Sequence, residues 1–269
     1  MNNLLGIIQG RLSKSPKNRL QYFPKKWENE FSKAKRANYD YIEFFSERKF
    51  NKQNPIWDNF LINKYKNLAK KNNLKIINFC DDYVINNDLR KKKTIKYSIK
   101  LLRQVKFLGA RNFILPLYGA SEINKKNLKT FIKPFKKIIK FTKKNKINLL
   151  LETNLSFKEY NNFLNFFENE KIYLVFDTGN RVIKNRDLSS EIIQFKKYLK
   201  LVHIKNRDKF YKNSLLNGGL VNFTKVFNAL KNIKYKGNFT IESTRTQNPF
   251  NIAKKNARKI NYLIKKKLK

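Results

Sequence analysis

The sequence predicts an α/β fold, a single-domain (β/α)8 TIM barrel that covers residues 1–269. Eight short apolar runs begin 25 to 38 residues apart, which leaves room for a helix after each run. The segments between the runs have apolar residues at the 3.6-residue helical period. The runs are apolar throughout instead of alternating, which is typical of parallel strands covered on both faces.

The eight predicted strands cover residues 4–8, 41–45, 75–80, 112–117, 147–151, 172–176, 201–204 and 239–241. No linker rich in Pro, Gly or Ser interrupts their alternation with helical segments, so we expect no internal domain boundary. A doubly wound open sheet is the alternative. The first run is not followed by Gly-x-Gly-x-x-Gly, which argues against a dinucleotide-binding version of that sheet.

Capping residues mark the starts of two predicted helices. Ser156 and Glu159 have the spacing of a capping box, and Asn222 is placed to cap a second helix. Apolar residues within 131–139, 160–167 and 223–230 share one face of each helix. The last predicted helix begins at about residue 251 and ends in a basic tail.

Composition excludes several classes of protein. Hydrophobic residues make up 41% of the chain and aromatic residues 14%, which is too apolar for a disordered chain. Cys80 is the only cysteine, so a disulfide scaffold is excluded. The sequence has no apolar run near the ~18 residues of a membrane span, and its N-terminus does not have the pattern of a signal peptide. We therefore expect a soluble cytoplasmic protein.

The net charge is +42, from 61 Lys and Arg against 19 Asp and Glu. Such a charge suits nucleic acid, and a non-catalytic nucleic-acid-binding module is one alternative function. However, lysine is spread along the whole chain together with Asn, Ile, Phe and Tyr, as an AT-rich genome would produce. We therefore expect no specific nucleic-acid partner and no membrane partner. The charge would draw a small anionic substrate towards a cleft, and a homo-oligomer is possible.

Acidic residues and the only histidine stand at the ends of four consecutive predicted strands. They are Glu152, Asp177, His203 and Glu242. Any one of them alone could cap a helix, shape a turn or pack in the core. In a TIM barrel, however, these positions meet at the catalytic face, and three clustered carboxylates would repel one another without a cation. Carboxylates with one imidazole suit a divalent ion such as Mn, Mg, Co or Zn.

These strand ends resemble those of the sugar phosphate isomerase/epimerase family, the xylose-isomerase-like TIM barrels, and the resemblance covers essentially the whole chain. It is carried by residues 6–12, 22–24 with Trp27, 41–44, 151–154, 176–180, 202–205 and 241–243. The resemblance implies that Glu152, Asp177, His203 and Glu242 bind the metal and that the two Glu act as catalytic acid and base. It also implies isomerisation or epimerisation of a sugar or sugar phosphate through an enediolate.

The chain departs from the family pattern after the seventh strand. A familiar form of that motif is His-x-Lys-Asp, whereas here Asn206 takes the place of the acid and Asp208 follows two residues later. The glycine segment at 218–222 has no acidic residue. A single histidine also argues against the DNA-cutting branch of this fold, which needs several for its zinc cluster. A metal-dependent lyase, such as a dehydratase of keto-inositols, is the second alternative function.

Further polar residues near the strand ends are predicted to bind the substrate. They are Gln9, Arg11, Glu43, Asp82, Asn180, Lys205, Arg207 and Arg245. The last three follow the seventh and eighth strands, where barrel enzymes often bind phosphate. A guanidinium can grip a phosphate or carboxylate through two parallel hydrogen bonds, so Arg207 and Arg245 are expected to bind the charged end of the substrate.

Overall fold

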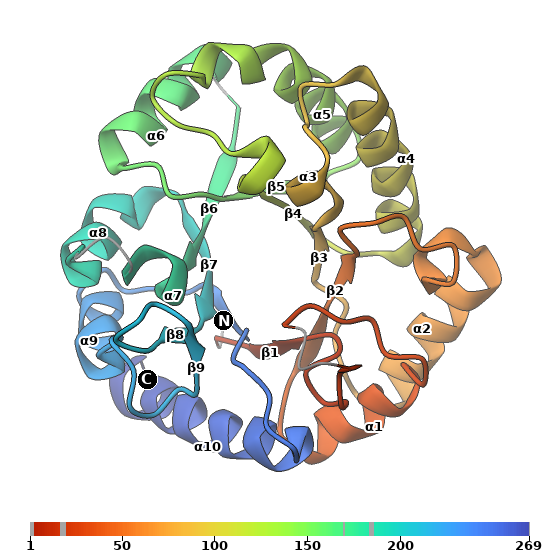
Figure 1. Ribbon diagram of the computed structural model, residues 1–269, viewed down its shortest axis with the longest axis vertical. Helices are drawn as coiled ribbons and strands as arrows, with labels where there is room; N and C mark the ends of the chain where they lie inside the picture. Colours follow the sequence, from red (N-terminus) through yellow and green to blue (C-terminus); the bar gives the residue numbers. More distant parts are fainter. Residues whose placement is uncertain (1–2, 17–19, 169, 183–185, 269) are drawn as a thin grey trace. The chain divides into compact units, whose positions relative to one another are not determined.

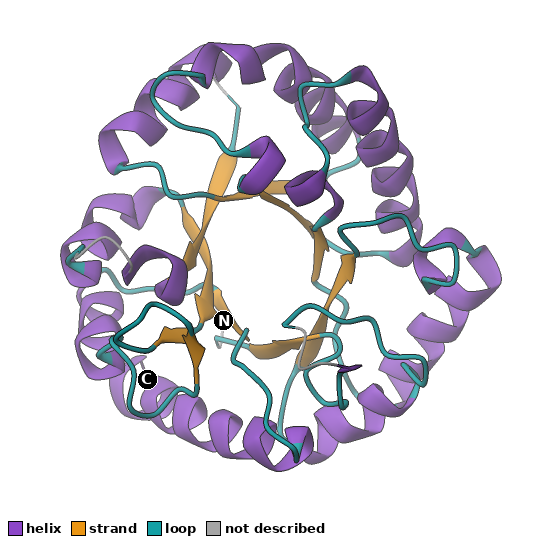
Figure 2. Cartoon of the chain, in the orientation of Figure 1, coloured by secondary structure: helices purple, strands orange, loops and turns teal. Residues whose placement is uncertain are grey.

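Eight parallel strands form a closed barrel in the order β1-β10-β7-β6-β5-β4-β3-β2 (Figures 1 and 2). The computed structural model describes residues 3–16, 20–168, 170–182 and 186–268. The barrel strands are β1 (Leu5–Ile8), β2 (Tyr41–Ser46), β3 (Asn78–Asp81), β4 (Asn112–Pro116), β5 (Asn148–Glu152), β6 (Ile172–Asp177), β7 (Leu199–Ile204) and β10 (Asn238–Ile241). The fold class predicted from the sequence is confirmed.

Helices separate these strands along the chain. They are α1 (Asn29–Arg36), α2 (Asn59–Lys71), α3 (Tyr83–Asn86), α4 (Lys92–Leu108), α5 (Ile132–Lys144), α6 (Phe157–Leu164), α7 (Thr178–Arg181), α8 (Leu188–Gln194), α9 (Phe223–Asn232) and α10 (Pro249–Leu268). A small antiparallel pair, β8 (Asn206–Arg207) and β9 (Asn213–Ser214), lies in the loop after β7. Among the described helices, none combines the length and the apolarity that crossing a bilayer requires.

The predicted strand starts agree with the structure to within two residues, except that of the third strand. The third strand begins at Asn78, because Lys75 makes only an isolated bridge to Tyr41. Both predicted caps are present: Ser156 and Glu159 form the capping box of α6, and Asn222 accepts a hydrogen bond from the Lys225 amide at 3.0 Å. The lysines at 91–93 and 143–144 are exposed.

The chain forms two compact units. The first comprises residues 1–43, 69–75 and 175–269, and the second comprises residues 44–68 and 76–174. In the first unit β1 pairs with β2 and β10, and β10 pairs with β7. In the second unit β3 pairs with the end of β2 and with β4, and β4 pairs with β5.

A buried tyrosine joins three strands of the first unit. The Tyr41 hydroxyl donates to the Phe239 carbonyl at 2.8 Å and lies 2.8 Å from the Thr240 hydroxyl. A Cβ at position 6 would lie 2.2 Å from the Tyr41 ring, so only glycine fits beside it. The Thr240 hydroxyl in turn donates to Glu43 Oε2 at 2.8 Å. Hydrogen bonds through Thr240 therefore connect the buried Tyr41 to the Glu43 carboxylate at the strand end.

Asparagines form a ladder at the starts of three strands in the second unit. Asn78 pairs in register with Asn112, and Asn112 with Asn148. The Asn112 amide donates to Asn78 Oδ1 at 2.7 Å, and the Asn148 amide donates to Asn112 Oδ1 at 2.8 Å. Buried polar side chains are tolerated when they are hydrogen-bonded, and the ladder supplies donors to the Oδ1 atoms of the buried Asn78 and Asn112 from Asn112 and the half-buried Asn148.

Candidate active site

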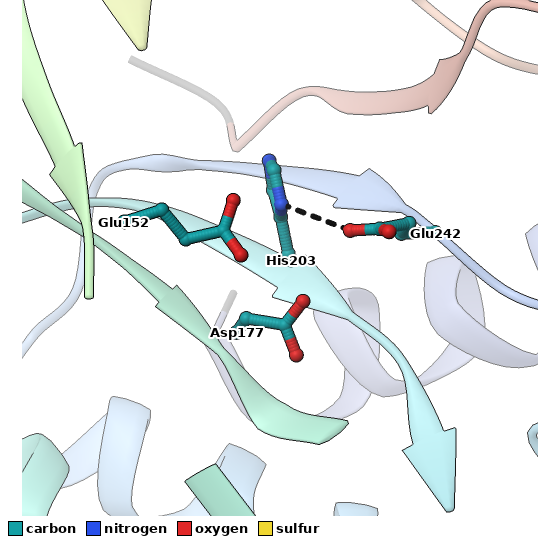
Figure 3. Close-up of side chains that lie close together, drawn as sticks. All are labelled: Glu152, Asp177, His203 and Glu242. Carbon is teal, nitrogen blue, oxygen red and sulfur yellow. Dashed lines mark ion pairs between the residues drawn. The ribbon is translucent and has the colours of Figure 1, made fainter. Parts of the chain in front are cut away.

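The carboxyl ends of four strands carry the predicted cluster. Glu152 ends β5, Asp177 ends β6, His203 lies one residue before the end of β7, and Glu242 directly follows β10. All four are buried, and one ligand atom from each lies within 4.8 Å of the others (Figure 3). The strand ends therefore gather these side chains as the sequence predicts.

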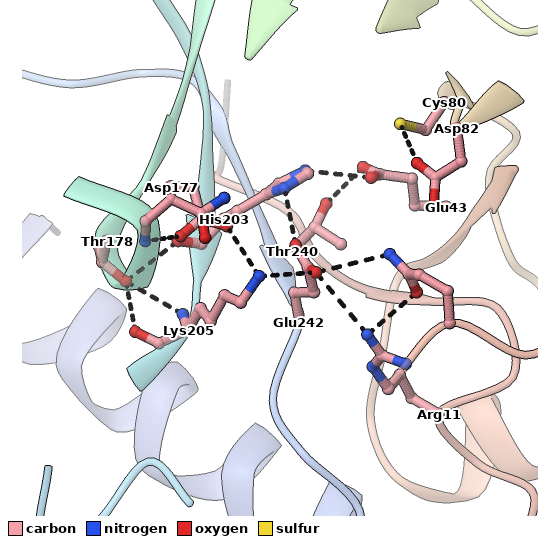
Figure 4. Close-up of polar contacts among 12 residues, drawn as sticks. Arg11, Glu43, Cys80, Asp82, Asp177, Thr178, His203, Lys205, Thr240 and Glu242 are labelled. Atoms are coloured by element: carbon pink, nitrogen blue, oxygen red, sulfur yellow. Dashed lines mark hydrogen bonds and ion pairs between the residues drawn. The ribbon is translucent and has the colours of Figure 1, made fainter. Parts of the chain in front are cut away.

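His203 lies between two carboxylates. Its Nε2 is 3.0 Å from Glu43 Oε1, and its Nδ1 is 3.4 Å from Glu242 Oε2 (Figure 4). Glu43 is completely buried, and its other oxygen accepts the Thr240 hydroxyl. The predicted site residue Glu43 thus lies directly beside the imidazole.

Positive and amide groups surround the other oxygen of Glu242. Lys205 Nζ is 3.0 Å from Glu242 Oε1 and 3.7 Å from Asp177 Oδ2. Arg11 Nη2 lies 3.8 Å from the same Glu242 oxygen, and Gln21 Nε2 lies 3.5 Å from it. Glu242 therefore presents Oε1 to donors and Oε2 to His203.

The pKa values of the two carboxyls beside Lys205, Asp177 and Glu242, are shifted in opposite directions. Burial raises the pKa of Asp177, and the attraction of Lys205 offsets that rise only in part. Burial also acts to raise the pKa of Glu242, but Lys205, His203 and Arg11 together hold it well below its ordinary value. Glu242 is therefore ionised across the neutral range, whereas the ionised form of Asp177 is the less stable of the two.

The donor set fits a divalent cation. Asp177 Oδ1 accepts the Asn180 amide at 2.6 Å, which makes it the N-cap of α7. Its Oδ2 is buried and accepts no hydrogen bond from the described residues. Three carboxylates and one imidazole, with a buried oxygen still able to bind, match the preferences of Mn, Mg, Co or Zn. The capping role and the metal role of Asp177 thus use different oxygens.

Other predicted substrate residues also lie near the cluster. The backbone N–H of Gln9 donates to the backbone carbonyl of Glu43 at 2.9 Å, and the Gln9 side chain is buried. Asn180 accepts a hydrogen bond from Arg207 Nη2 at 2.8 Å. The guanidinium of Arg207 is thus held by the side-chain oxygen of Asn180, which lies three residues after Asp177.

Two predicted substrate residues have clear local contacts. Arg245 Nε donates to the Gly10 carbonyl at 2.8 Å, and its Nη1 donates to the Leu20 carbonyl at 3.0 Å. These bonds hold the loop after β1. Asp82 lies directly before α3 and accepts a hydrogen bond from the thiol of the buried Cys80 at 3.3 Å.

Two residues of the site region are not predicted from the sequence: Gln21 in the loop after β1, and Glu30 in the first turn of α1. Gln21 reaches Glu242, and Glu30 accepts a hydrogen bond from the Gly10 amide. Burial raises the pKa of Glu30 despite that bond and the nearby charge of Arg245. Neither residue ends a strand or belongs to a periodic pattern, so no signal in the sequence marks them.

Comparison with solved structures finds the same fold at low identity. D-psicose 3-epimerase from Clostridium cellulolyticum H10, solved with D-tagatose, superposes with a TM-score of 0.77 at 15% identity over 99% of each chain. An L-ribulose 3-epimerase gives 0.77 at 16% identity, covering 98% of this chain and 95% of that one. A sugar phosphate isomerase/epimerase from Parabacteroides distasonis gives 0.68 at 17% identity, covering 96% and 93%.

Sequence comparison identifies the family directly. No curated protein matches the chain. The family model described as xylose isomerase-like TIM barrel matches residues 31–265, most of the sequence. This match agrees with the closed barrel and with the resemblance carried by the strand-end motifs. The chain belongs to the xylose isomerase-like TIM barrel family.

Proposed function

We propose that the protein is a metal-dependent enzyme that isomerises or epimerises a sugar or sugar phosphate through an enediolate. One observation carries this proposal: three carboxylates and the only histidine are buried together at the ends of four strands. The solved structures named for 3-epimerases and for a sugar phosphate isomerase/epimerase support the choice of substrate class.

Glu152, Asp177, His203 and Glu242 are the residues that would hold the divalent ion. When bound, such an ion polarises a carbonyl and stabilises the negative charge of an enediolate. Glu43 would keep the imidazole of His203 in place, because its carboxylate lies 3.0 Å from Nε2. A carboxylate partner of this kind orients a histidine and raises its basicity.

Glu152 and Glu242 would act as acid and base. One carboxylate removes the proton from the carbon next to the carbonyl, and the other returns a proton. Return to the opposite face of the same carbon yields the epimer, and return to the neighbouring carbon yields the aldose–ketose isomer. The pKa of Glu242, held well below its ordinary value by Lys205, His203 and Arg11, keeps this residue ionised at neutral pH.

Deuterium exchange tests the proposal. The protein is incubated in D2O with Mn²⁺ and a panel of ketoses and ketose phosphates, and substrate deuterium is followed by NMR. We expect exchange of the proton next to the carbonyl together with formation of an epimer or isomer. Glu152→Gln and Glu242→Gln keep the side-chain shapes and should each lower the exchange rate at least about a hundredfold, the effect of losing a general acid or base.

The same experiment separates the alternatives. Glu122→Gln, in an exposed residue, removes one charge and is expected to exchange at the parent rate. Loss of water from the substrate would indicate the lyase instead. Exchange that persists at the parent rate in both Glu152→Gln and Glu242→Gln would refute the assignment of acid and base.

A further inference from the structure

Lys205 occupies a position built specifically to hold its side chain. Thr178 Oγ1 accepts the Lys205 amide at 3.0 Å and lies 2.7 Å from the Lys205 carbonyl. A Cβ at position 179 would lie 2.7 Å from Lys205 Cγ and 3.0 Å from its Cβ, so the aliphatic stem packs directly against Gly179. The segment after Asp177 therefore holds both the backbone and the stem of this lysine.

The ammonium group at the end of this stem contacts two of the proposed metal ligands. Lys205 is 5% exposed, and its Nζ lies 3.0 Å from Glu242 and 3.7 Å from Asp177 (Figure 4). A buried charge is strongly unfavourable unless it is paired, so this arrangement stabilises the lysine and both carboxylates together. The lysine and the divalent ion would share the same carboxylates.

We propose that Lys205 is a positioning residue that serves as the internal counter-charge of the metal site: it holds Glu242 through Oε1, keeps the carboxylate cluster assembled before the metal binds, and lowers the affinity for the divalent ion. This inference rests on the proposed function for the identity of the site. Because Lys205 contacts Oε1 while Oε2 lies towards His203, Oε2 is the oxygen of Glu242 that would be left for the ion.

Removal of the Lys205 ammonium should lower the stability of the metal-free protein and raise its affinity for a divalent ion. Without the ammonium, the carboxylates of Asp177 and Glu242 lose a buried partner, so the metal-free protein is less stable. Without the ammonium, a divalent ion at the same carboxylates is no longer repelled by a neighbouring positive charge, so it binds more tightly. A lysine that only maintained the local fold would weaken metal binding when removed, which is the opposite result.

The test compares Lys205→Met, Lys205→Arg and the control Lys225→Met. Lys225 is exposed on α9, so its replacement removes one charge at a distance from the cluster. Arginine has the same carbons beside Gly179 as lysine and keeps the positive charge. Mn²⁺ affinity is measured from the electron paramagnetic resonance signal of free Mn²⁺, and the thermal midpoint of metal-free protein is measured by circular dichroism.

We expect K205M to bind Mn²⁺ at least tenfold more tightly than the parent and to have a lower metal-free midpoint, with K205R and K225M close to the parent in both. Weaker or unchanged Mn²⁺ binding by K205M would overturn the proposal. If K205M does not fold without metal, Lys205→Gln, which keeps a neutral donor, takes its place under the same criteria. If the parent itself binds no Mn²⁺, the proposed function fails, while a parent-like metal-free midpoint in K205M overturns the counter-charge independently.

Discussion

Polar side chains are accommodated differently at the carboxyl ends and at the amino ends of the barrel strands. At the carboxyl ends of β6 and β7 and just after β10, Asp177, His203 and Glu242 are charged or chargeable, and one oxygen of Asp177 accepts no hydrogen bond from the described residues. At the amino ends of β3, β4 and β5, neutral asparagines bond to one another in register. The asparagine end is satisfied internally, whereas the acidic end is arranged for a ligand.

The carboxyl and amino ends of the strands differ in how their polar side chains affect the stability of the folded protein. Neutral amides that pair with one another leave few groups for a ligand and favour the folded state. Clustered buried carboxylates oppose the folded state unless a cation joins them. The acidic end therefore depends on Lys205 and, when bound, on a divalent ion to hold its carboxylates together, whereas the asparagine end is held by hydrogen bonds between its own side chains.

The largest expected effect comes from Asp177→Asn. This change keeps an oxygen for the Asn180 amide but removes the charge of a metal ligand. Loss of an outer partner costs up to about 100-fold in metal affinity, so loss of a ligand should cost more than about 1,000-fold, or ~4 kcal/mol. Calorimetric titration with Mn²⁺ measures it, with Glu122→Gln as the control for net charge. Parent-like binding by D177N would remove Asp177 from the site.

The buried carboxyl at the end of β3 is expected to make the free energy of unfolding depend on pH. Asp81 accepts the hydroxyls of Ser46 at 2.9 Å and Ser98 at 2.7 Å, and burial raises its pKa to about 6 from 3.8. Because the folded pKa is the higher one, the protonated form favours folding. This contribution is complete below about pH 4 and is lost as the pH rises through 6.

Asp81→Asn should remove that dependence. Relative to D81N, the free energy of unfolding of the parent should fall by about 3 kcal/mol between pH 3 and pH 7, at about 1.36 kcal/mol for each pKa unit. Urea unfolding of both proteins across this range measures the difference, and other titrating groups cancel. Parallel profiles for the two proteins would show that Asp81 has an ordinary pKa.

Asn112→Ala breaks the asparagine ladder at its centre. It leaves Asn78 Oδ1 without its donor and the Asn148 amide without its acceptor, so we expect a loss of about 2 kcal/mol in unfolding free energy. Asn228→Ala, in an exposed residue of α9, is the matched control. Mn²⁺ affinity should stay unchanged in both. A ladder variant that lost metal binding while keeping its stability would reverse the proposed division between the two ends.

The smallest expected effect separates two arginines that the sequence treats alike. Arg207→Met should raise KM for a phosphorylated ketose about tenfold, the value of ~1.4 kcal/mol, and leave a neutral ketose nearly unaffected. Arg245→Met should impair both substrates equally, because Arg245 bonds to the Gly10 and Leu20 carbonyls of the loop after β1. Steady-state kinetics with matched phosphorylated and neutral ketoses measures this; equal losses in R207M would give Arg207 a structural role as well.

Short-range patterns account for what the sequence by itself determined. Apolar runs and helical periods are local properties, so the eight strands, the barrel and the caps at Ser156 and Asn222 are predictable. Because parallel strands share one carboxyl edge, the four residues at the strand ends are also predictable as a group. Their roles as metal ligands, and those of Glu152 and Glu242 as acid and base, stay predictions.

Only the tertiary structure decided which side chains meet across long stretches of sequence. The contact of Lys205 with Glu242, the reach of Gln21 to the same carboxylate and the asparagine ladder each join residues that are tens to hundreds of positions apart. The sequence places Lys205 and Arg245 after the seventh and eighth strands, but it does not show which groups these two side chains contact. The register and the loop after β1 give one lysine a buried pair of carboxylates and one arginine two backbone carbonyls, because hydrogen-bond partners are set by packing in space and not by spacing along the chain.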